Sequence, residues 1–375
     1  MGALTIVALA AGFVLLIAGG EALVRGASQL ARILGMSPIV VGLTVVAFAT
    51  STPELAVSAG AALSGHPGLA VGNVVGSNIA NILLIIGLTA LFAPLLVKSR
   101  IVRTDIPVMV GFSVVLLVVA IDGTISRLNG VLLVGGLLIY VVVTVVTSRR
   151  RAPESAVAPT SASREGSGTG AAGGGSRKQS VLISVGLVAL GVLLLVVGAR
   201  LLVSAASDVA AVLGVSDLIV GLTVVAIGTS LPELATSLIA AFRGERDLAV
   251  GNIVGSNVFN IGAVLGSTAL ITPIEVAPSA IRFDLPIMLA VALVLLPVAF
   301  TGMVVKRWEG TLFAGFYGAY IGYLVLQASG HEALEPYSAA MLWFVIPITA
   351  LSLILLATYE LGVLRGRREA RRLSR

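Results

Sequence analysis

The chain has 375 residues, of which 57% are hydrophobic and 11% are charged, and its mean hydropathy is +1.08. A soluble domain carries about 25% charged residues, so this composition excludes a soluble protein and indicates a polytopic membrane protein with helical spans. The chain has no cysteine, which excludes disulfides, thiolate metal sites and thiol catalysis.

Eleven hydrophobic spans follow one another along the chain. They are expected at residues 4–30, 38–63, 69–91, 105–120, 128–147, 181–206, 218–241, 248–271, 284–299, 309–326 and 339–361. Between the fifth and sixth spans, residues 149–180 are rich in Ser, Gly, Ala and Pro. Such a composition cannot bury a core, so it predicts a flexible linker.

The basic residues predict the orientation of the spans. With the amino terminus outside, 20 of the 24 Lys and Arg residues fall on the cytoplasmic side, and only Arg127 and Arg282 fall outside. The net charge of +6 therefore records membrane topology, and no nucleic-acid partner is expected. We expect an integral protein of the cell's inner (plasma) membrane, embedded in the lipid bilayer, with the linker and the basic tail in the cytoplasm.

Two stretches of the chain occur twice, 179 residues apart. Residues 42–58, GLTVVAFATSTPELAVS, return as residues 221–237, GLTVVAIGTSLPELATS, with thirteen of seventeen positions identical. Residues 72–83, GNVVGSNIANIL, return as residues 251–262, GNIVGSNVFNIG, with eight of twelve identical. Because each half holds five spans, an odd number, the two copies enter the membrane from opposite sides. This is the inverted repeat of many secondary transporters.

The predicted fold is therefore an all-α polytopic membrane protein, with a ten-helix core of two inverted five-helix repeats and an eleventh, carboxy-terminal helix. Its parts are expected at residues 1–148 (first repeat, motif 42–83), 149–180 (linker), 181–328 (second repeat, motif 221–262) and 329–375 (extra transmembrane helix and basic tail).

Each repeated motif places one glutamate, Glu54 or Glu233, inside an apolar span. A carboxylate at that depth is costly and indicates function, although a buried structural pair is the alternative. The side chains at helical spacing around the glutamates carry hydroxyl and amide groups, without sulfur or imidazole. Such oxygen donors suit hard cations, and Ca²⁺ takes about six to eight of them. Pro53 and Pro232 are expected to free the carbonyls of Ala49 and Gly228 as further ligands.

Glycines at GxxxG spacing are expected to bring spans three and eight against spans two and seven. The pairs are Gly72 with Gly76 and Gly251 with Gly255.

The charge of the two glutamates suggests a mechanism. If both are ionised, one Ca²⁺ or two Na⁺ neutralise them, and an apolar site disfavours holding both kinds of ion together. Mutual exclusion at one site, with access alternating between the two sides, is antiport. Protons could also neutralise the glutamates, so this argument leaves the counter-ion open.

The paired motifs resemble the two alpha-repeats of the Ca²⁺/cation antiporter superfamily, and most closely its sodium/calcium exchanger branch of prokaryotic type. The resemblance covers ten of the eleven spans. It implies a ten-helix bundle that transports Ca²⁺ and Na⁺, without catalytic residues or a cofactor. Carried over by position, it implies as cation ligands Glu54, Glu233, Thr50, Ser51, Ser77, Asn81, Thr229, Ser230, Ser256 and Asn260, with backbone carbonyls near Ala47 and Ala226.

The sequence departs from some relatives at one ligand position. Members that resemble this chain but depend on potassium favour aspartate at one of the two amide positions, whereas here Asn81 and Asn260 are both amides. Proton-coupled relatives usually carry glutamate after the Gly-Asn pair, where this chain has Val74 and Ile253. A proton- or potassium-coupled Ca²⁺ antiporter remains the alternative. An ion channel and an intramembrane hydrolase are weaker ones, and the oligomeric state is left open.

Other polar residues in the spans have structural interpretations. Glu21 and Arg25 are four residues apart and are expected to pair. Asp105 and Asp284 precede a proline near a helix start and are interpreted as helix caps. The remaining motif amides are expected to hydrogen-bond between helices: Asn73, Asn78, Asn252 and Asn257.

Overall fold

The protein is built almost wholly of helices. The computed structural model describes residues 3–65, 67–151, 175–212 and 226–352, with residues 354, 355, 358 and 362 beyond them. Within these residues, nine helices are long and apolar enough to cross a membrane, and the bent pair Pro38–Thr50 and Thr52–Leu63 makes a tenth. Helices dominate because hydrocarbon offers no partner to an exposed backbone polar group.

The first half runs from α1 to α8. Its elements are α1 (Ala3–Leu34), α2 (Pro38–Val41), the π-helical η1 (Gly42–Val46), α3 (Ala47–Thr50), α4 (Thr52–Leu63), α5 (Pro67–Ala80), η2 (Asn81–Ile86), α6 (Gly87–Phe92), β1 (Leu95–Leu96), η3 (Ile101–Asp105), α7 (Ile106–Ala120), β2 (Thr124–Ile125) and α8 (Arg127–Arg151).

The second half repeats this order. Its elements are α9 (Gly175–Val212), α11 (Ala226–Thr229), α12 (Leu231–Phe242), α13 (Arg246–Phe259), η6 (Asn260–Leu265), α14 (Gly266–Ile271), β3 (Ile274–Glu275), η7 (Ala280–Asp284), α15 (Leu285–Phe300), η8 (Thr301–Met303), β4 (Val304–Val305) and α16 (Arg307–Ala328), followed by α17 (Leu334–Ala340) and η9 (Met341–Val345).

Helices occupy the described part of every predicted span. The predicted seventh span is described only from Ala226 onward, and the eleventh is described without gaps only to Ser352. Helix α8 continues to Arg151 and α9 begins at Gly175, so helices extend into both ends of the predicted linker. Residues 152–174 of that linker lie outside the described residues.

The two halves are related as an inverted repeat. Strand β1 of the first half pairs antiparallel with β4 of the second half, and β2 of the first half pairs with β3 of the second. Each short strand therefore pairs with a strand of the other half. The π-helical segments recur at matching places, at Asn81 and Asn260 and again at Ile101 and Ala280. The predicted all-α fold of two inverted repeats with an added carboxy-terminal helix is confirmed: nine of the ten core spans and the added helix are long enough to cross a membrane, and the seventh span is described only in its α11 and α12 part.

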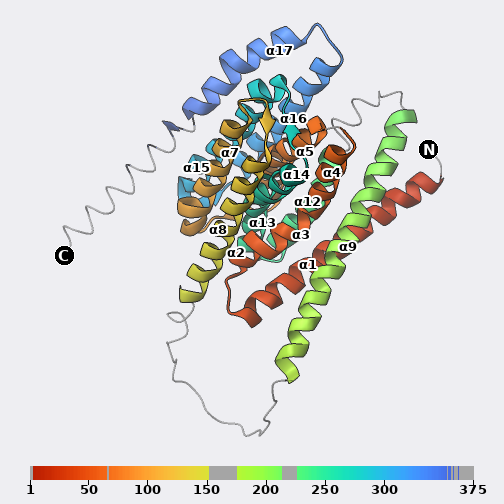
Figure 1. Ribbon diagram of the computed structural model, residues 1–375, viewed down its shortest axis with the longest axis vertical. Helices are drawn as coiled ribbons and strands as arrows, with labels where there is room; N and C mark the ends of the chain where they lie inside the picture. The colour runs from red at the N-terminus through yellow and green to blue at the C-terminus, as the bar shows by residue number, and fades with distance from the viewer. Residues whose placement is uncertain are drawn as a thin grey trace.

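Helices α1 and α9 form a closely packed pair that lies along one side of the molecule (Figure 1). Glycines allow the close approach. A Cβ added to Gly19 would lie 2.9 Å from the Gly191 carbonyl oxygen, and one added to Gly191 would lie 2.6 Å from the Leu23 nitrogen. Gly12 and Gly198 repeat this contact one heptad away, with a Cβ on either lying 2.9 Å from the other's carbonyl oxygen.

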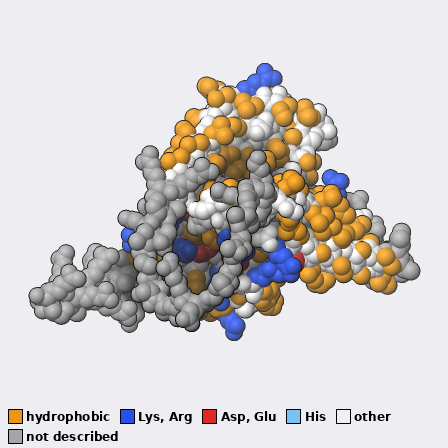
Figure 2. Space-filling view, turned by 90° about the horizontal axis from the view of Figure 1, so that it is seen from below, with side chains coloured by type: hydrophobic (Ala, Val, Ile, Leu, Met, Phe, Trp, Pro, Cys, Tyr) orange, Lys and Arg blue, Asp and Glu red, His pale blue; other side chains and the backbone are white. Residues whose placement is uncertain are grey.

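The helices that carry the repeated asparagines lie at the centre of the molecule. In the most apolar window of the span Arg246–Ile271, 94% of the residues are buried, against 28% for the outer span Arg127–Ser148. Hydrophobic side chains cover much of the described surface (Figure 2). The repeated asparagines therefore lie in the most buried of the described spans.

The predicted glycine contacts are seen in one half. A Cβ added to Gly251 would lie 2.7 Å from the Ile39 carbonyl oxygen, and one added to Gly255 would lie 2.8 Å from that of Leu43. These short distances bring span eight against span two. A Cβ on Gly72 or Gly76 would meet no atom within 4 Å in the described part of the chain.

Candidate cation-binding site

Each glutamate of the repeated motif lies in the first turn of a helix that follows a break. Span two is bent by 41° between Thr50 and Thr52. The backbone leaves helical geometry at Ser51 (φ −81°, ψ 2°) and at Ser230 (φ −91°, ψ 3°). Both carboxylates therefore lie beside the amino-terminal end of a helix, where the macrodipole favours negative charge.

The prolines begin new helices instead of interrupting continuous ones. Pro53 and Pro232 stand in the first turns of α4 and α12, where the missing N–H would have no intrahelical acceptor. The predicted role of the Ala49 and Gly228 carbonyls as further ligands stays a prediction. The Ala47 carbonyl accepts hydrogen bonds from the Ser51 amide (3.0 Å) and the Thr50 hydroxyl (3.4 Å). Ala226 is the first residue of α11.

The two carboxylates are fully buried and lie close enough to interact electrostatically. Glu54 and Glu233 have no exposed surface, and each belongs to a different half. Among the described residues, none of their four oxygens has a hydrogen-bond partner. The hydroxyls of Thr50 and Ser256 lie beside the Glu233 carboxylate without reaching hydrogen-bond geometry. Two buried carboxylates of this kind need a source of positive charge.

Further oxygens without a donor accompany the carboxylates. Within the described part of the chain, buried oxygens lack a hydrogen-bond partner at Ser51, Ser77, Asn81, Ser230 and Asn260. Buried polar groups are normally paired, so each of these oxygens without a partner is unusual. No group of three or more His, Asp or Glu side chains that could hold a metal occurs in that part. A cation bound here would depend on hydroxyl and amide oxygens as well as the two carboxylates.

Threonines of one half bond to asparagines of the other. Thr50 donates to the Asn252 Oδ1 atom at 3.2 Å, and the Thr50 Oγ1 atom lies 3.3 Å from the Ser256 Oγ atom. Thr229, at the position matching Thr50, donates to the Asn73 Oδ1 atom at 3.3 Å. Each half therefore supplies hydrogen bonds that the other half needs.

Serines that were not predicted as functional anchor these asparagines. Asn73 donates to the Ser58 hydroxyl at 3.0 Å and to the Glu54 carbonyl at 3.3 Å. Asn252 donates to the Ser237 hydroxyl at 3.2 Å. Ser58 and Ser237 are the last residues of the first repeated motif, and this identity was the signal that could have identified them.

The amides of Asn81 and Asn260 are held by their nitrogens. Asn81 donates to the Asn257 Oδ1 atom at 3.2 Å, and Asn260 donates to that of Asn78 at 3.0 Å. Their own Oδ1 atoms are among the buried oxygens without a donor. With Asn73 and Asn252, the motif amides hydrogen-bond between helices, as expected for these asparagines.

The surroundings of the two glutamate helices differ. On α12, Thr236 is fully buried, and α1 approaches so closely that a Cβ on Gly20 would lie 2.5 Å from Ile239. At the matching positions of α4, Val57 is 44% exposed, and a Cβ on Gly60 would meet no described atom within 4 Å. The structure therefore covers the approach along α12 and leaves the face of α4 open.

An ion pair holds α1 on α12. Glu21 pairs with Arg25, with the Nε to Oε1 distance at 2.8 Å, and this predicted pair is confirmed. Glu21 also accepts a hydrogen bond from Arg243 Nε at 2.6 Å, just beyond the end of α12. Glu21 thus links the outer helix pair to the helix that carries Glu233.

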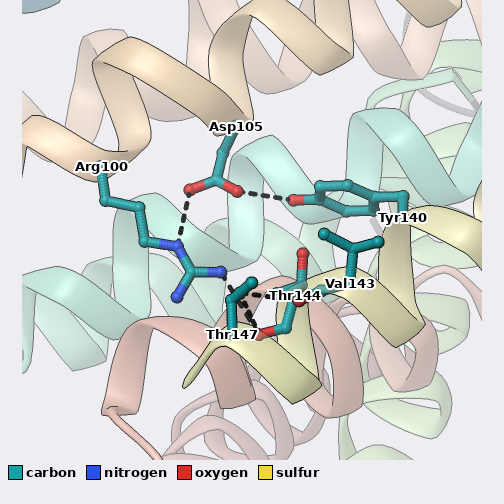
Figure 3. A network of polar contacts seen from close by, with 6 residues as sticks. All are labelled: Arg100, Asp105, Tyr140, Val143, Thr144 and Thr147. Atoms are coloured by element: carbon teal, nitrogen blue, oxygen red, sulfur yellow. Dashed lines mark hydrogen bonds and ion pairs between the residues drawn. The ribbon is translucent and has the colours of Figure 1, made fainter. Parts of the chain in front are cut away.

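Asp105 and Asp284 lie apart from this cluster and do not cap helices through their side chains. Asp105 is fully buried, accepts a hydrogen bond from Tyr140 at 3.1 Å and faces Arg100, whose Nε lies 3.8 Å from Oδ2 (Figure 3). Asp284 accepts a hydrogen bond from Tyr320 at 3.4 Å. The capping prediction was wrong because each carboxylate bonds instead to a tyrosine about 35 residues away.

Comparisons with known proteins agree on one family. The family model for "Sodium/calcium exchanger protein" matches residues 4–146 and 183–326. "Putative antiporter CaxA" of Alkalimonas amylolytica is 39% identical over 318 residues, covering 84% of this chain and 96% of the relative. "Sodium/calcium exchanger MaX1" of Methanosarcina acetivorans is 34% identical over 338 residues, covering 83% and 95%. "Inner membrane protein YrbG" of Escherichia coli is 40% identical over 288 residues, covering 76% and 86%.

Solved structures agree with these sequence matches. The structure of the sodium-calcium exchanger NCX_Mj soaked with 10 mM Na⁺ and 10 mM Sr²⁺ superposes with a TM-score of 0.71 at 33% sequence identity. The match covers 86% of this chain and 99% of that one. A second NCX_Mj structure, soaked with 10 mM Na⁺ and no Ca²⁺, also gives a TM-score of 0.71 at 31% identity.

Proposed function

Because the chain belongs to the sodium/calcium exchanger family, we propose that it is a secondary active antiporter exchanging Ca²⁺ for Na⁺ at one site between its two halves. Family membership supports cation antiport in general, and the named relatives include an antiporter and an exchanger rather than enzymes. Beyond this, we propose that the counter-ion is Na⁺ and that the residues named below bind the cation.

One observation carries the proposal: two buried carboxylates from opposite halves, Glu54 and Glu233, interact electrostatically and have no hydrogen-bond partner among the described residues. We infer that the further ligands are oxygens that also lack a partner there, those of Ser51, Ser77, Asn81, Ser230 and Asn260. One Ca²⁺ matches the charge of two ionised carboxylates, and so do two Na⁺. Since a low-dielectric site strongly disfavours excess positive charge, binding of one kind of ion excludes the other. Mutually exclusive binding at a single site produces exchange.

Thr50, Thr229 and Ser256 have a different role in this proposal. Thr50 and Ser256 lie beside the Glu233 carboxylate, while Thr50 and Thr229 also hydrogen-bond to asparagines of the opposite half. We infer that these hydroxyls both contribute oxygen to the cation and join the halves around it. The carbonyls near Ala47 and Ala226 complete the proposed set. In this conformation the Ala47 carbonyl already accepts two hydrogen bonds.

The unequal covering of α4 and α12 supports alternating access. Helix α1 covers α12, whereas the face of α4 that includes Val57 and Gly60 is open. Because the halves are inverted copies, the opposite arrangement has α9 covering α4 and α12 open. A shift of the α1–α9 pair between these arrangements would expose the carboxylates to one side of the membrane at a time.

The orientation follows from the basic residues. We infer that the amino terminus lies outside and that the linker and the tail lie in the cytoplasm, in an inner membrane like that of the E. coli relative. With this orientation, the open face of α4 leads to the outside. Arg243, which pairs with Glu21, lies at the cytoplasmic end of α12.

The test is ⁴⁵Ca²⁺ uptake into proteoliposomes that contain the purified protein. An outwardly directed Na⁺ gradient should drive uptake, and reversing the gradient should reverse it. K⁺ and pH gradients, imposed one at a time, separate Na⁺ coupling from the two alternative couplings. Uptake that does not respond to any counter-ion gradient would favour a channel and contradict antiport.

A further inference from the structure

Two methionine sulfurs contact the asparagines that hold the site amides. Asn257 Nδ2 lies 3.3 Å from the Met109 Sδ atom, and Asn78 Nδ2 lies 3.7 Å from that of Met288. Met109 is on α7 and Met288 is on α15, and they match at the 179-residue offset. Both are 1% exposed. Neither methionine belongs to the repeated motifs or to the proposed ligand set.

A thioether sulfur can accept a hydrogen bond but cannot donate one. An asparagine side chain that contacts it is therefore stabilised with its Nδ2 toward the sulfur. Facing Met109 in this way, Asn257 directs its Oδ1 atom away from the sulfur and toward Asn81. Asn81 then donates its own Nδ2 at 3.2 Å, which leaves its Oδ1 atom as the end of the amide that has no donor among the described residues.

The same sequence of contacts occurs in the other half. Met288 accepts from Asn78, the Oδ1 of Asn78 accepts from Asn260 at 3.0 Å, and the Oδ1 of Asn260 has no donor within the described chain. Each chain of contacts begins at an atom that only accepts and ends at an oxygen that lacks a donor. Because the methionine sulfur can only accept, it fixes which group donates and which accepts in each hydrogen bond of this series of contacts.

The orientation of the side chain matters for an amide ligand but not for a carboxylate ligand. A carboxylate presents oxygen in either rotamer, whereas a flipped asparagine presents an NH₂ group that repels a cation. Resting on the function proposed above, we propose that Met109 is a positioning residue. Through Asn257 it holds the oxygen of the site amide Asn81 toward the transported cation.

The two halves differ in how strongly the methionine is needed. Asn78 Nδ2 also donates to the Asn257 backbone carbonyl at 3.3 Å, and this second acceptor holds the same orientation. For Asn257 Nδ2, the Met109 sulfur is the hydrogen-bond acceptor given by the structure in its described part. Replacing Met109 should therefore matter more than replacing Met288, which makes Met288 a matched control.

The experiment compares Met109→Leu with Met288→Leu in Na⁺-driven ⁴⁵Ca²⁺ uptake. Leucine conserves volume but cannot accept a hydrogen bond. Loss of one neutral hydrogen bond corresponds to roughly a three- to tenfold change, so the KM for Ca²⁺ should rise by about that factor in Met109→Leu. It should change less than about twofold in Met288→Leu. Met109→Gln restores an acceptor oxygen and should bring the KM back toward the wild-type value.

A double-mutant comparison separates orientation from packing. In an Asn81→Asp background the ligand offers oxygen in either rotamer, so adding Met109→Leu should not raise the KM further. If Met109→Leu acts only by loosening the core, it raises the KM by the same factor in both backgrounds, and the proposal is overturned. Equal KM values in wild type and Met109→Leu also overturn it.

Failure of the proposed function is recognised separately. If the wild type takes up no Ca²⁺ under any gradient, both proposals fail. If the wild type exchanges Ca²⁺ and Met109→Leu leaves the KM for Ca²⁺ unchanged, the proposed function stands and the positioning role is refuted. A variant that does not fold is identified by thermal unfolding in detergent without Ca²⁺, and Met109→Gln then carries the test through its KM.

Discussion

Replacing either buried glutamate with glutamine should strongly weaken cation binding and yet stabilise the ion-free protein. Glutamine keeps the size of the side chain and removes its charge. In Glu54→Gln, the remaining Glu233 carboxylate would face a bound Ca²⁺ alone. Removing one partner from a buried charge pair costs about 3–5 kcal/mol, and about 1.4 kcal/mol is a tenfold change in affinity. Ca²⁺ affinity should thus fall by about two to three and a half orders of magnitude.

The stabilisation has the same origin. In the absence of a cation, two carboxylates lie buried, close to each other and without hydrogen-bond partners among the described residues. When both are ionised, each destabilises the other, and removing one charge relieves that repulsion. The melting temperature of Glu54→Gln in cation-free detergent should therefore be at least that of the wild type.

The assay is thermal unfolding of both proteins with and without Ca²⁺, combined with ⁴⁵Ca²⁺ uptake. A ligand at 100 times its Kd stabilises the native state by about 2.7 kcal/mol, so Ca²⁺ should raise the melting temperature of the wild type clearly. Glu54→Gln should not respond at the same Ca²⁺ concentration. Asp284→Asn is the control, because it removes a carboxylate outside the site and should keep the Ca²⁺ response. A normal Ca²⁺ response in Glu54→Gln would refute the ligand assignment.

Three further predictions follow from packing and topology. Gly255→Ala places a Cβ 2.8 Å from the backbone of span two, so it should destabilise the protein by about 1–3 kcal/mol and reduce uptake. Gly76→Ala is the control, because its Cβ would meet no described atom within 4 Å, and it should change neither stability nor uptake. Thermal unfolding and ⁴⁵Ca²⁺ uptake measure both effects. Because the chain has no cysteine, membrane-impermeant thiol reagents applied to intact cells should label Ser64→Cys and not Ser99→Cys, and the reverse pattern would overturn the orientation. Deleting residues 159–175 should leave Na⁺-driven ⁴⁵Ca²⁺ uptake within about twofold of wild type, since the proposed site contains no residue of that segment, and a large loss would contradict its role as a simple connector.

The helical spans and the inverted relation of the halves could be predicted because they follow from local apolar runs and from the number of spans in each half. Long apolar runs must be helical in lipid, and an odd number of spans per half inverts the second copy. The same offset brought Glu54 and Glu233 to equivalent places. Both side chains are buried and interact electrostatically, whereas their role as cation ligands stays a prediction.

Other features depend on contacts that no local pattern specifies. Asp105 precedes a proline and resembles a cap, but its partner is Tyr140, 35 residues later on another helix. The pairing of Glu21 with Arg25 follows helical spacing, whereas its pairing with Arg243 requires the packing of α1 on α12. Spacing alone also could not show that Asn81 and Asn260 donate to other asparagines while their own oxygens remain without a donor in the described chain.

The hydrogen bonds between threonines and asparagines of opposite halves bear on how such a chain could have arisen. A half on its own would leave the Asn73 or Asn252 oxygen without the threonine that now donates to it. An ancestor with a single half would have needed a second copy of itself, inserted upside down, to supply that threonine. Fusion of two such genes would then have made permanent a partnership that had existed before between separate chains.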